Sequence, residues 1–380
     1  MKQIVRDGLA DRVRAVFEEN FAERGELGAS VSVWLEGEEL VSLSSGWCER
    51  EQQRPWTERS LAPVYSSTKG PAAATFLMVL EEAGLSPDAW VRSVWPELGA
   101  GRIGDLTFLE LLSHQAGLPG IANQTSVADR EAVVRGLEET APYWEPGEGH
   151  GYHARTIGFC LDELCQRILG CRLGECFQQW IGGPLELDFW IGLPAEENDR
   201  VATLYPGRYL VRKEEKEFYQ AMQTEGSLSR RAFTSLKGFQ SAGEMNDPEA
   251  WAGGFPAFGG VGSAAALARF YQAVLGYGEV IPASVGRLLG ERVVEGPDQV
   301  LRVATSFAAG MMMDARDDSG KKRRQLFGPN DEAFGHPGAG GSHAFCDPAT
   351  GVSFAYVMNQ MELGVLPGER ALGLVKAIYA

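Results

Sequence analysis

Residues 64–71 read Val-Tyr-Ser-Ser-Thr-Lys-Gly-Pro and run directly into an apolar stretch at 72–80. Proline is favoured in the first turn of a helix, and an apolar run of this length is typical of a buried one. We therefore expect a buried helix with Ser66 at its N-terminus. Because side chains three residues apart share one face of a helix, Lys69 should lie beside Ser66.

This pair of side chains is suited to nucleophilic catalysis. The positive end of the helix dipole disfavours a protonated lysine and favours negative charge developing on the Ser66 oxygen. A lysine with its ordinary pKa of about 10.4 is a poor base at neutral pH. Removal from water between two domains would lower the pKa of Lys69. The alternative is that Ser66 only caps the helix, which is the usual role of a serine at this position.

The spacing alone is weak evidence, because Ser-x-x-Lys occurs again at 319–322. That second copy lies within 314–324, which reads Asp-Ala-Arg-Asp-Asp-Ser-Gly-Lys-Lys-Arg-Arg. Such a charged segment is too polar to bury and predicts a solvated surface loop. Ser66, by contrast, opens an apolar helix, so the context separates the two motifs.

Farther out, the N-terminal part of the chain predicts a helix followed by a hairpin. Apolar residues recur on one helical face over 9–21. Apolar and polar residues then alternate over 31–35, and an extended pattern resumes at 40–43 after a turn at 36–38. This order predicts two antiparallel strands packed beside an amphipathic helix.

The C-terminal part repeats this arrangement. Residues 342–346 and 352–358 predict strands joined by the turn Asp-Pro-Ala-Thr-Gly at 347–351, and 369–379 predicts a closing helix. Two hairpins with flanking helices at opposite ends of the chain indicate one antiparallel sheet built from both termini. The predicted fold class is therefore α/β of the α+β kind, with helices packed on the sheet.

The middle of the chain would then be an insertion. The whole chain of 380 residues exceeds what one hydrophobic core usually supports, so we expect two sub-domains or one large domain with an insertion. The predicted division places a discontinuous α/β domain at 1–84 and 251–380, and a mainly helical inserted domain at 85–250. The helical patterns of the insertion include 108–112, 157–169 and 177–181.

Composition excludes some classes of partner. The net charge of −16 repels nucleic acid and anionic membrane surfaces alike. No signal-peptide pattern and no apolar run of membrane-spanning length is present, so we expect a soluble cytoplasmic protein with reduced cysteines. Four of the six cysteines lie close together at Cys160, Cys165, Cys171 and Cys176, but their spacing is not that of zinc ligands. Core thiols are the favoured interpretation.

Three further segments bear on function. Gly-Tyr-His-Ala at 151–154 precedes an apolar helix and places Tyr152 in a loop of the insertion. Phe-Gly-His-Pro-Gly-Ala-Gly-Gly-Ser at 334–342 leads into the C-terminal hairpin, with glycines that allow a ligand to approach the backbone. The third segment lies between the Ser-x-x-Lys motif at 66–69 and the Tyr152 segment, and reads Leu-Leu-Ser-His-Gln-Ala-Gly-Leu-Pro at 111–119.

Ser-x-x-Lys, a tyrosine element and a His-x-Gly element in this order resemble the class C β-lactamase and penicillin-binding-protein superfamily over nearly the whole chain. Within that superfamily the sequence is most similar to the family VIII carboxylesterases. The resemblance implies an active site in the cleft between the two domains. It also implies that Ser66 forms an acyl-enzyme, that Lys69 is its partner and that Tyr152 shuttles the proton.

The resemblance extends to the third element. His336 occupies the place where β-lactamases usually have lysine, and Gly338 belongs to the same substrate-binding strand. The oxyanion hole would be formed by the backbone N–H groups of Ser66 and Ala339. Because an unperturbed histidine titrates at a pKa of about 6.5, His336 is expected to impose a limb on the pH–rate profile. No metal or organic cofactor is implied.

Two departures from the β-lactamase pattern point to the substrate. Ala154 stands where an asparagine would bind an amide side chain, and Ile121 places an apolar side chain where another polar contact is expected. Lost hydrogen bonds of this kind disfavour β-lactams more than small esters. We therefore predict a carboxylesterase acting on small carboxylic esters.

Alternatives from other classes stay open. The same acyl-enzyme would serve an acyltransferase, or an amide hydrolase of the β-lactamase or D-amino-acid peptidase kind. A non-catalytic binder of β-lactams or peptidoglycan is disfavoured, since all three elements are present. A Ser-His-Asp triad on a nucleophile elbow is also disfavoured, because the chain has no Gly-x-Ser-x-Gly. For His114, in the connecting motif, we expect a hydrogen-bonded structural role.

Overall fold

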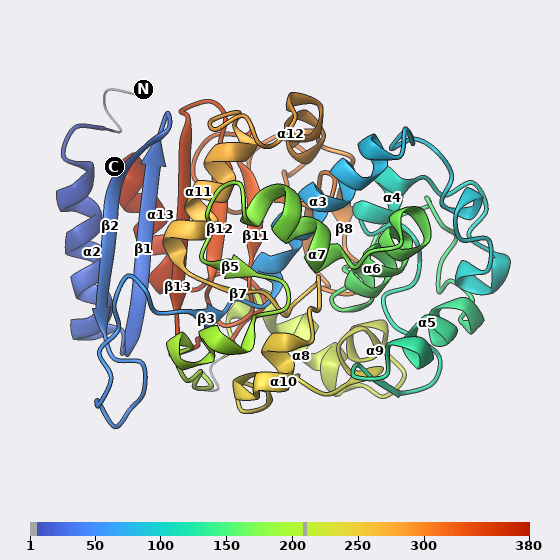
Figure 1. The fold of residues 1–380 in the computed structure, drawn as a ribbon, viewed down its shortest axis with the longest axis horizontal. Helices are drawn as coiled ribbons and strands as arrows, with labels where there is room; N and C mark the ends of the chain where they lie inside the picture. The colour runs from blue at the N-terminus through green and yellow to red at the C-terminus, as the bar shows by residue number, and fades with distance from the viewer. Residues whose placement is uncertain (1–5, 208–210) are drawn as a thin grey trace.

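A computed structural model describes residues 6–207 and 211–380. Its central feature is an eight-stranded sheet in which all neighbouring strands are antiparallel (Figure 1). The predicted antiparallel sheet built from both ends of the chain is confirmed. Across the sheet the order is β2 (Glu38–Gly46), β1 (Gly28–Leu35), β13 (Val352–Met358), β12 (His343–Asp347), β11 (Phe334–Pro337), β10 (Met312–Met313), β9 (Ala304–Phe307) and β8 (Val294–Pro297).

The two chain ends meet where β1 pairs with β13. Val31 lies opposite Tyr356, and Val33 lies opposite Phe354. Every residue of β13 is buried, whereas β2 at the edge carries an exposed and more polar pattern. A polar edge strand discourages pairing with other chains. The N-terminal hairpin therefore closes one side of the sheet, and the C-terminal hairpin forms its centre.

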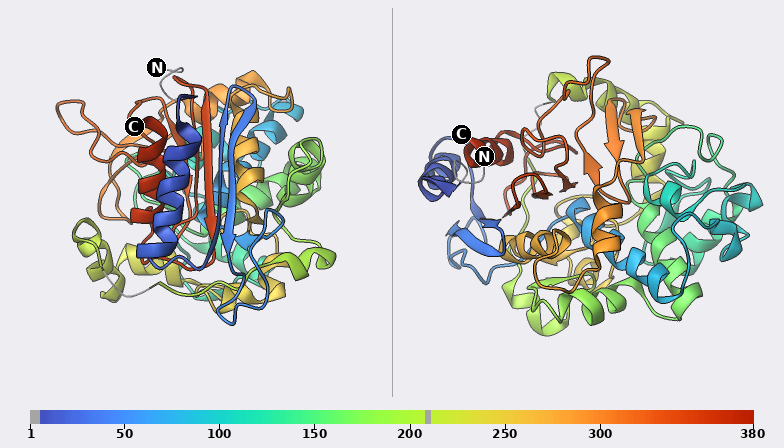
Figure 2. Two further views of the ribbon diagram at one scale, coloured as in Figure 1. Left: turned by 90° about the vertical axis from the view of Figure 1, so that its left-hand side faces the viewer. Right: turned by 90° about the horizontal axis from the view of Figure 1, so that it is seen from above.

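Helices cover both faces of this sheet, which is why its central strands are buried. α2 (Leu9–Glu23) and α13 (Glu369–Tyr379) lie side by side on one face, and α11 (Ala264–Val274) packs on β1, β12 and β13 from the other (Figure 2). The helices predicted at the two ends of the chain are confirmed.

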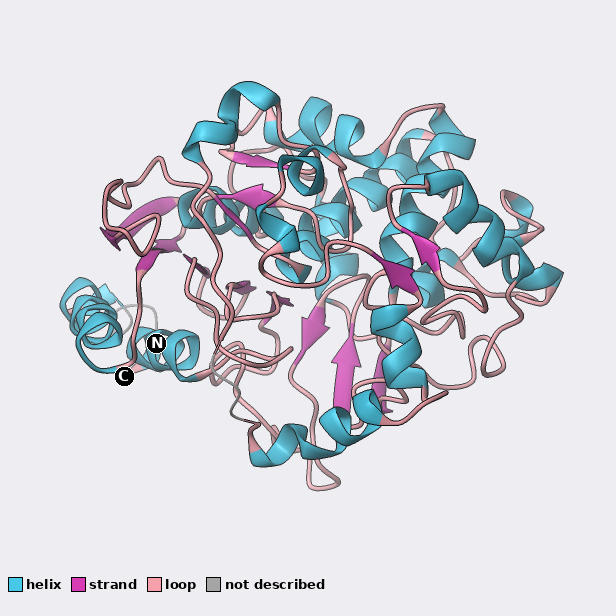
Figure 3. Cartoon of the chain, turned by 90° about the horizontal axis from the view of Figure 1, so that it is seen from below, coloured by secondary structure: helices cyan, strands magenta, loops and turns pink. Residues whose placement is uncertain are grey.

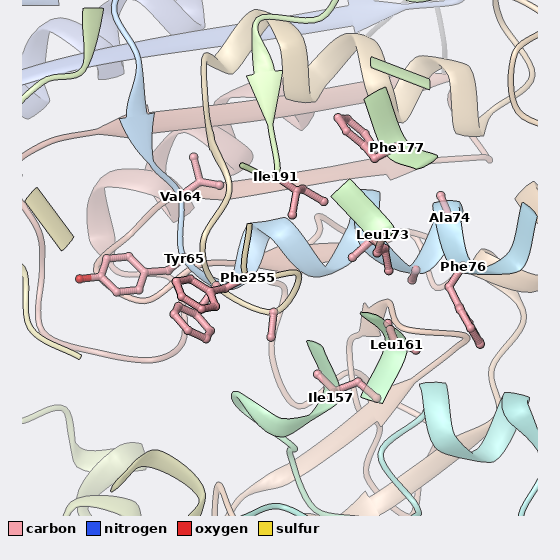
Figure 4. Close-up of a cluster of buried hydrophobic side chains, with 14 of the residues drawn as sticks. Val64, Tyr65, Ala74, Phe76, Ile157, Leu161, Leu173, Phe177, Ile191 and Phe255 are labelled. Carbon is pink, nitrogen blue, oxygen red and sulfur yellow. The ribbon is translucent and has the colours of Figure 1, made fainter. Parts of the chain in front are cut away.

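α3 (Lys69–Glu82) runs through the interior of the molecule. Its residues from Lys69 to Leu77 are all buried, and most of them are apolar, as expected of a core helix. In Figure 4, side chains from α6 and α7, such as Leu161 and Leu173, approach it closely. The first turn of α3 is therefore held rigidly.

The remaining helices gather mostly on the side of the molecule away from both termini (Figure 3). The segment predicted as a helix at 177–181 is in fact the end of one helix and a following π-helical turn, Gln178–Gly182. The remaining helices are α4 (Phe108–Leu112), α5 (Arg130–Glu139), α6 (Thr156–Leu169), α7 (Leu173–Phe177), α8 (Lys216–Gln223), α9 (Leu228–Thr234), α10 (Pro248–Ala252) and α12 (Ala283–Gly290).

Two small sheets accompany these helices. The three-stranded one has the order β3 (Ala62–Pro63), β7 (Val261–Gly262) and β5 (Phe189–Trp190), and the two-stranded one pairs β4 (Thr125–Ser126) with β6 (Leu236–Lys237). One hydrophobic cluster includes side chains from both predicted domains, such as Phe76, Leu164 and Leu267. The predicted domain limits stay a prediction. Across the described ranges, no helix has the length and apolar character needed to cross a bilayer.

The charged segment 314–324 differs in part from its prediction. Its middle is exposed, including Ser319 of the second Ser-x-x-Lys motif. At its ends, however, the Asp314 carboxylate is buried and pairs with the Lys322 ammonium at 3.1 Å. A charged residue can be buried when such a partner and backbone groups satisfy it, and Lys322 also donates to the Gly328 carbonyl. The sequence pattern did not reveal this pairing.

All five histidines are buried. His343 on β12 is an example away from the site: its Nε2 lies 2.7 Å from the Leu326 carbonyl oxygen. Burial lowers the pKa of His343 to about 4, although the Leu326 carbonyl opposes part of this shift. The folded protein therefore keeps this ring neutral at a pH where the unfolded chain would bind a proton, and stability is lost as pH falls below about 6.5.

The variant His343→Gln should therefore lose less stability on acidification than the wild type. Between about pH 7 and about pH 5, the drop in its free energy of unfolding should be smaller by about 2 kcal/mol, because one proton-binding difference is removed. Urea unfolding at both pH values measures this difference. An equal drop in both proteins would show that His343 binds its proton equally in the folded and unfolded states.

Candidate active site

Ser66 reaches the surface from an otherwise buried segment. All residues from Leu61 to Leu77 except Ser66 are buried. Ser66 opens a short 3₁₀ turn, Ser66–Thr68, and α3 follows at Lys69. Ser66 was predicted at the N-terminus of the helix. The α-helix itself begins three residues later, after the 3₁₀ turn.

The backbone on both sides of Ser66 is fixed by neighbouring strands. The Val64 N–H donates to the Gly260 carbonyl at 2.9 Å, and the Gly260 N–H donates to Thr68 Oγ1 at 2.9 Å. Tyr65, directly before Ser66, has φ of 48° and ψ of −129°. A non-glycine residue rarely adopts a positive φ, and such strain concentrates at functional sites. The sharp turn at Tyr65 presents Ser66 outward.

Lys69 extends its side chain toward Ser66 inside the protein. Its Nζ lies 3.1 Å from Ser66 Oγ, 2.9 Å from the Ala154 carbonyl oxygen and 2.8 Å from the Ala257 carbonyl oxygen. All three of these partners are uncharged. Burial, and secondly the positive charge of Arg155, hold the pKa of Lys69 well below its ordinary value. A buried amine of this kind favours its uncharged form.

Tyr152 lies across the site from α3. Its ring stands over Lys69 Nζ, 4.8 Å from the ring centre, and stacks on His336 and on Phe307 of β9. Within the described residues its hydroxyl is buried without a hydrogen-bond partner. Burial raises the pKa of Tyr152, and the nearby Ser66 hydroxyl opposes part of that rise. Tyr152 is therefore a neutral phenol that faces the serine.

A carboxylate holds the Tyr152 backbone in place. The Tyr152 N–H donates to Asp298 Oδ1 at 3.1 Å, and the same oxygen accepts the N–H groups of Val300 and Leu301 at 2.8 and 2.7 Å. The other oxygen, Oδ2, accepts the Thr305 hydroxyl at 3.0 Å. Four hydrogen bonds thus satisfy a buried carboxylate and tie the Tyr152 loop to the β8–β9 hairpin.

His336 does not behave as its sequence position suggested. Its Nδ1 lies 2.8 Å from the Pro337 carbonyl oxygen, and the ring is buried beside Tyr152. Burial, and secondly repulsion from Lys69 when that amine is protonated, lowers the pKa of His336 to about 3. The expectation that His336 titrates near neutrality is therefore wrong. The His-Pro-Gly motif does not indicate whether the His336 ring is buried.

The segment after β11 lies against the turn that carries Ser66. Gly338 packs directly against the Val64 carbonyl and Ser67, where a side chain would collide. This contact brings the segment after β11 against the turn that carries Ser66. In the described part of the chain, neither the Ser66 N–H nor the Ala339 N–H donates to a protein acceptor. Both donors are available to a ligand.

Other residues singled out in the sequence fall into different places. The Ala154 methyl group is buried, and its carbonyl, not its side chain, makes the contact with Lys69. Ile121 is fully buried against Gly136 of α5. Its contact with a substrate stays a prediction.

His114 has a structural setting. Its Nδ1 accepts the His153 N–H at 3.3 Å, and its ring packs edge-on against Tyr152 at 5.1 Å. Its Nε2 is buried without a partner among the residues described. His114 thus has the hydrogen-bonded structural role that was expected, and its ring also packs against Tyr152.

Several contributors were missed in the sequence. Asp298 follows a Gly-Pro pair, which signals a turn, and it does accept local N–H groups, but its bond to Tyr152 spans the fold. The Ala257 carbonyl carries no side-chain signal at all. No group of histidine, cysteine, aspartate and glutamate within 6–207 and 211–380 is arranged to hold a metal ion, and all six cysteines are free thiols.

Comparison with known proteins shows the family to which the chain belongs. The family described as Beta-lactamase matches residues 13–376. The chain is 30% identical over 370 residues to Esterase/beta-lactamase LipL of Mycobacterium tuberculosis (strain ATCC 25618 / H37Rv), covering 92% of this chain and 80% of LipL. The chain therefore belongs to the β-lactamase family, as a serine hydrolase with esterases among its homologues.

Solved structures show the same fold over nearly the whole chain. A penicillin-binding protein homolog from Caulobacter crescentus has a TM-score of 0.85 and 34% identity, covering 98% of this chain and 97% of the other. A family VIII carboxylesterase has a TM-score of 0.83 and 31% identity, also covering 98% and 97%. The resemblance to family VIII carboxylesterases and the predicted fold class are confirmed.

The Asp298 contact generates a test. Replacing Asp298 with alanine releases the Tyr152 N–H, so the phenol should shift by a fraction of an ångström or more. Misplacement on this scale lowers kcat by about 10²-fold. The kcat of folded Asp298→Ala for ester hydrolysis, measured below its unfolding temperature, tests this expectation.

The matched control is Asp314→Ala. Asp314 is also a buried aspartate that accepts backbone N–H groups, including that of Leu326 at 2.9 Å, but it does not contact Tyr152. Its loss should lower stability and leave kcat near the wild-type value. Equal effects of the two substitutions on kcat would argue that Asp298 contributes only general stability.

Proposed function

We propose that this protein is a carboxylesterase that cleaves small carboxylic esters through an acyl-enzyme on Ser66. One observation carries the proposal: the Lys69 amine is buried between two carbonyls and the Ser66 hydroxyl. An uncharged amine has two N–H groups and one lone pair. The carbonyls of Ala154 and Ala257 accept the two N–H groups, which leaves the lone pair for the Ser66 proton.

Acylation begins when Ser66 Oγ attacks the ester carbonyl carbon. The Ser66 proton passes to Lys69 Nζ, which acts as general base, and the carbonyl oxygen gains negative charge. The N–H groups of Ser66 and Ala339 stabilise this oxyanion, because both lack a protein acceptor and lie at the start of α3 and after β11. Charge developing there also gains from the helix dipole.

Collapse of this intermediate breaks the bond between the carbonyl carbon and the alkoxide. Tyr152 gives its phenol proton to the departing oxygen and regains a proton from the Lys69 ammonium. The raised pKa of Tyr152 fits a relay of this kind, since a buried phenol does not begin as a phenolate. Water then attacks the acyl-enzyme by the same path in reverse and releases the acid.

The structure offers more for esters than for β-lactams. Ala154 presents no side-chain amide, and its carbonyl is already occupied by Lys69. His336 is a neutral ring with its Nδ1 beside the Pro337 carbonyl, so it supplies no positive charge for a substrate carboxylate. The similar family VIII carboxylesterase supports an ester substrate, whereas the name of LipL covers both esterase and β-lactamase.

Replacing Ser66 with alanine should lower kcat by at least about 10³-fold while the fold is retained. Lys69→Ala and Tyr152→Phe should each be nearly as damaging, and combining either with Ser66→Ala should add little, because the three residues act as one unit. Steady-state rates with a short-chain aryl ester, beside circular dichroism for folding, provide the measurement.

Ser319→Ala is the matched control for this set. Ser319 belongs to the other Ser-x-x-Lys motif, is exposed, and its hydroxyl donates to Asp317 at 2.6 Å. Its removal should leave kcat unchanged. Retention of most activity in Ser66→Ala, or additive losses among the three variants, would overturn the assignment of Ser66 as nucleophile.

Substrate preference is expected to follow the missing polar partners. Each absent hydrogen bond is worth about 0.5 to 1.5 kcal/mol, so kcat/KM for a short-chain aryl ester should exceed that for a chromogenic cephalosporin by at least about tenfold. Both substrates are measured under identical conditions. A kcat/KM for the cephalosporin equal to or above that for the ester would contradict the carboxylesterase assignment and favour a β-lactamase.

A further inference from the structure

Two separate segments supply the carbonyls that bind Lys69. One carbonyl belongs to Ala154 in the Tyr152 loop, and the other to Ala257 in the segment before β7. Arg155 joins the two segments. It follows Ala154 in the chain, and its guanidinium lies over the ring of Phe258, which follows Ala257, at 4.2 Å from the ring centre. The Arg155 side chain thus bridges both carbonyl-bearing segments.

The Arg155 guanidinium is itself fixed. Its Nη1 donates to the Leu236 carbonyl at 2.7 Å and its Nη2 donates to the Gly238 carbonyl at 2.6 Å. The residue is only 6% exposed, and it forms no ion pair within the described ranges. Glu244 and the Tyr65 phenol face it at longer range. A planar guanidinium held at both ends cannot turn away from its neighbours without losing these bonds.

The other groups around Lys69 carry no charge at neutral pH. Ser66 and Tyr152 present hydroxyls, and burial lowers the pKa of His114 and of His336 so that both rings are neutral. Arg155 is therefore the positive charge that acts on Lys69 from the described surroundings, and it follows burial as the second cause of the shift in Lys69. A like charge in an apolar site disfavours protonation of the amine.

We infer that Arg155 is a positioning residue for Lys69: it clamps the two carbonyl acceptors and supplies a fixed positive charge that keeps the amine in its uncharged, basic form. This inference rests on the proposed function, in which uncharged Lys69 accepts the Ser66 proton. Arg155 acts through Lys69 and does not contact the reacting atoms.

The test is the pH profile of kcat/KM for a short-chain aryl ester. The rate rises with pH as Lys69 loses its proton, so the acid limb reports this group. Arg155→Met removes the charge and should move the limb to higher pH by about one unit. Activity below the limb should fall about tenfold and recover on the alkaline side. Arg155→Lys keeps the charge and should return the limb toward the wild-type position.

Arg231→Met is the matched control. Arg231 also donates to two carbonyls, those of Ile121 and Ala122, and lies over an aromatic ring, Tyr143, but it does not act on Lys69. Its loss should leave the limb in place. If Arg155→Met does not fold, Arg155→Gln carries the same test.

An unchanged limb in Arg155→Met, or an equal loss of rate at every pH, would overturn the inference. A shift of the same size in Arg231→Met would also overturn it. Labelling of wild-type Ser66 by a fluorophosphonate, located by mass spectrometry, tests the proposed function separately. Labelled Ser66 with an unmoved limb rejects only the role of Arg155, whereas absence of the label rejects the acyl-enzyme itself.

Discussion

Lys69 brings a basic nitrogen into a region from which water is largely excluded, and its direct partners there are a hydroxyl and two carbonyls. A charge buried without a carboxylate is costly, so the amine is more stable in its uncharged form. The rest of the site depends on this constraint. A neutral amine can accept the Ser66 proton at a pH where an exposed lysine would remain protonated.

The fold keeps water away from this amine by bringing distant segments together. α3 is buried from Lys69 to Leu77, and the 3₁₀ turn that opens with Ser66 leads directly into it. The segment after β11, from near the C-terminal end, packs through Gly338 against the turn before α3. The Tyr152 loop closes the third side and is anchored by Asp298. Because each wall belongs to a different packed element, the site gains rigidity from the whole core.

Local patterns predicted the parts of this account that are encoded locally. The closing helix was predicted at 369–379 and has those bounds, and the strand at 352–358 likewise. Ser66 and Lys69 were found because a three-residue spacing on a helix fixes their proximity. The burial of His336, the burial of Ile121 and the bond between Asp298 and Tyr152 depend on contacts between distant segments. A sequence identifies side chains but does not show which backbone carbonyls lie near them. The two backbone carbonyls that bind Lys69 could therefore not be predicted.

The charge state of Lys69 is the most direct test of this account. Protein labelled with ¹³C at the ε-carbon of lysine can be titrated by NMR, with Lys69→Ala used to assign the Lys69 resonance. The account predicts that this resonance has the shift of an uncharged amine at neutral pH. A Lys69 resonance with the shift of a protonated amine at neutral pH would contradict the account.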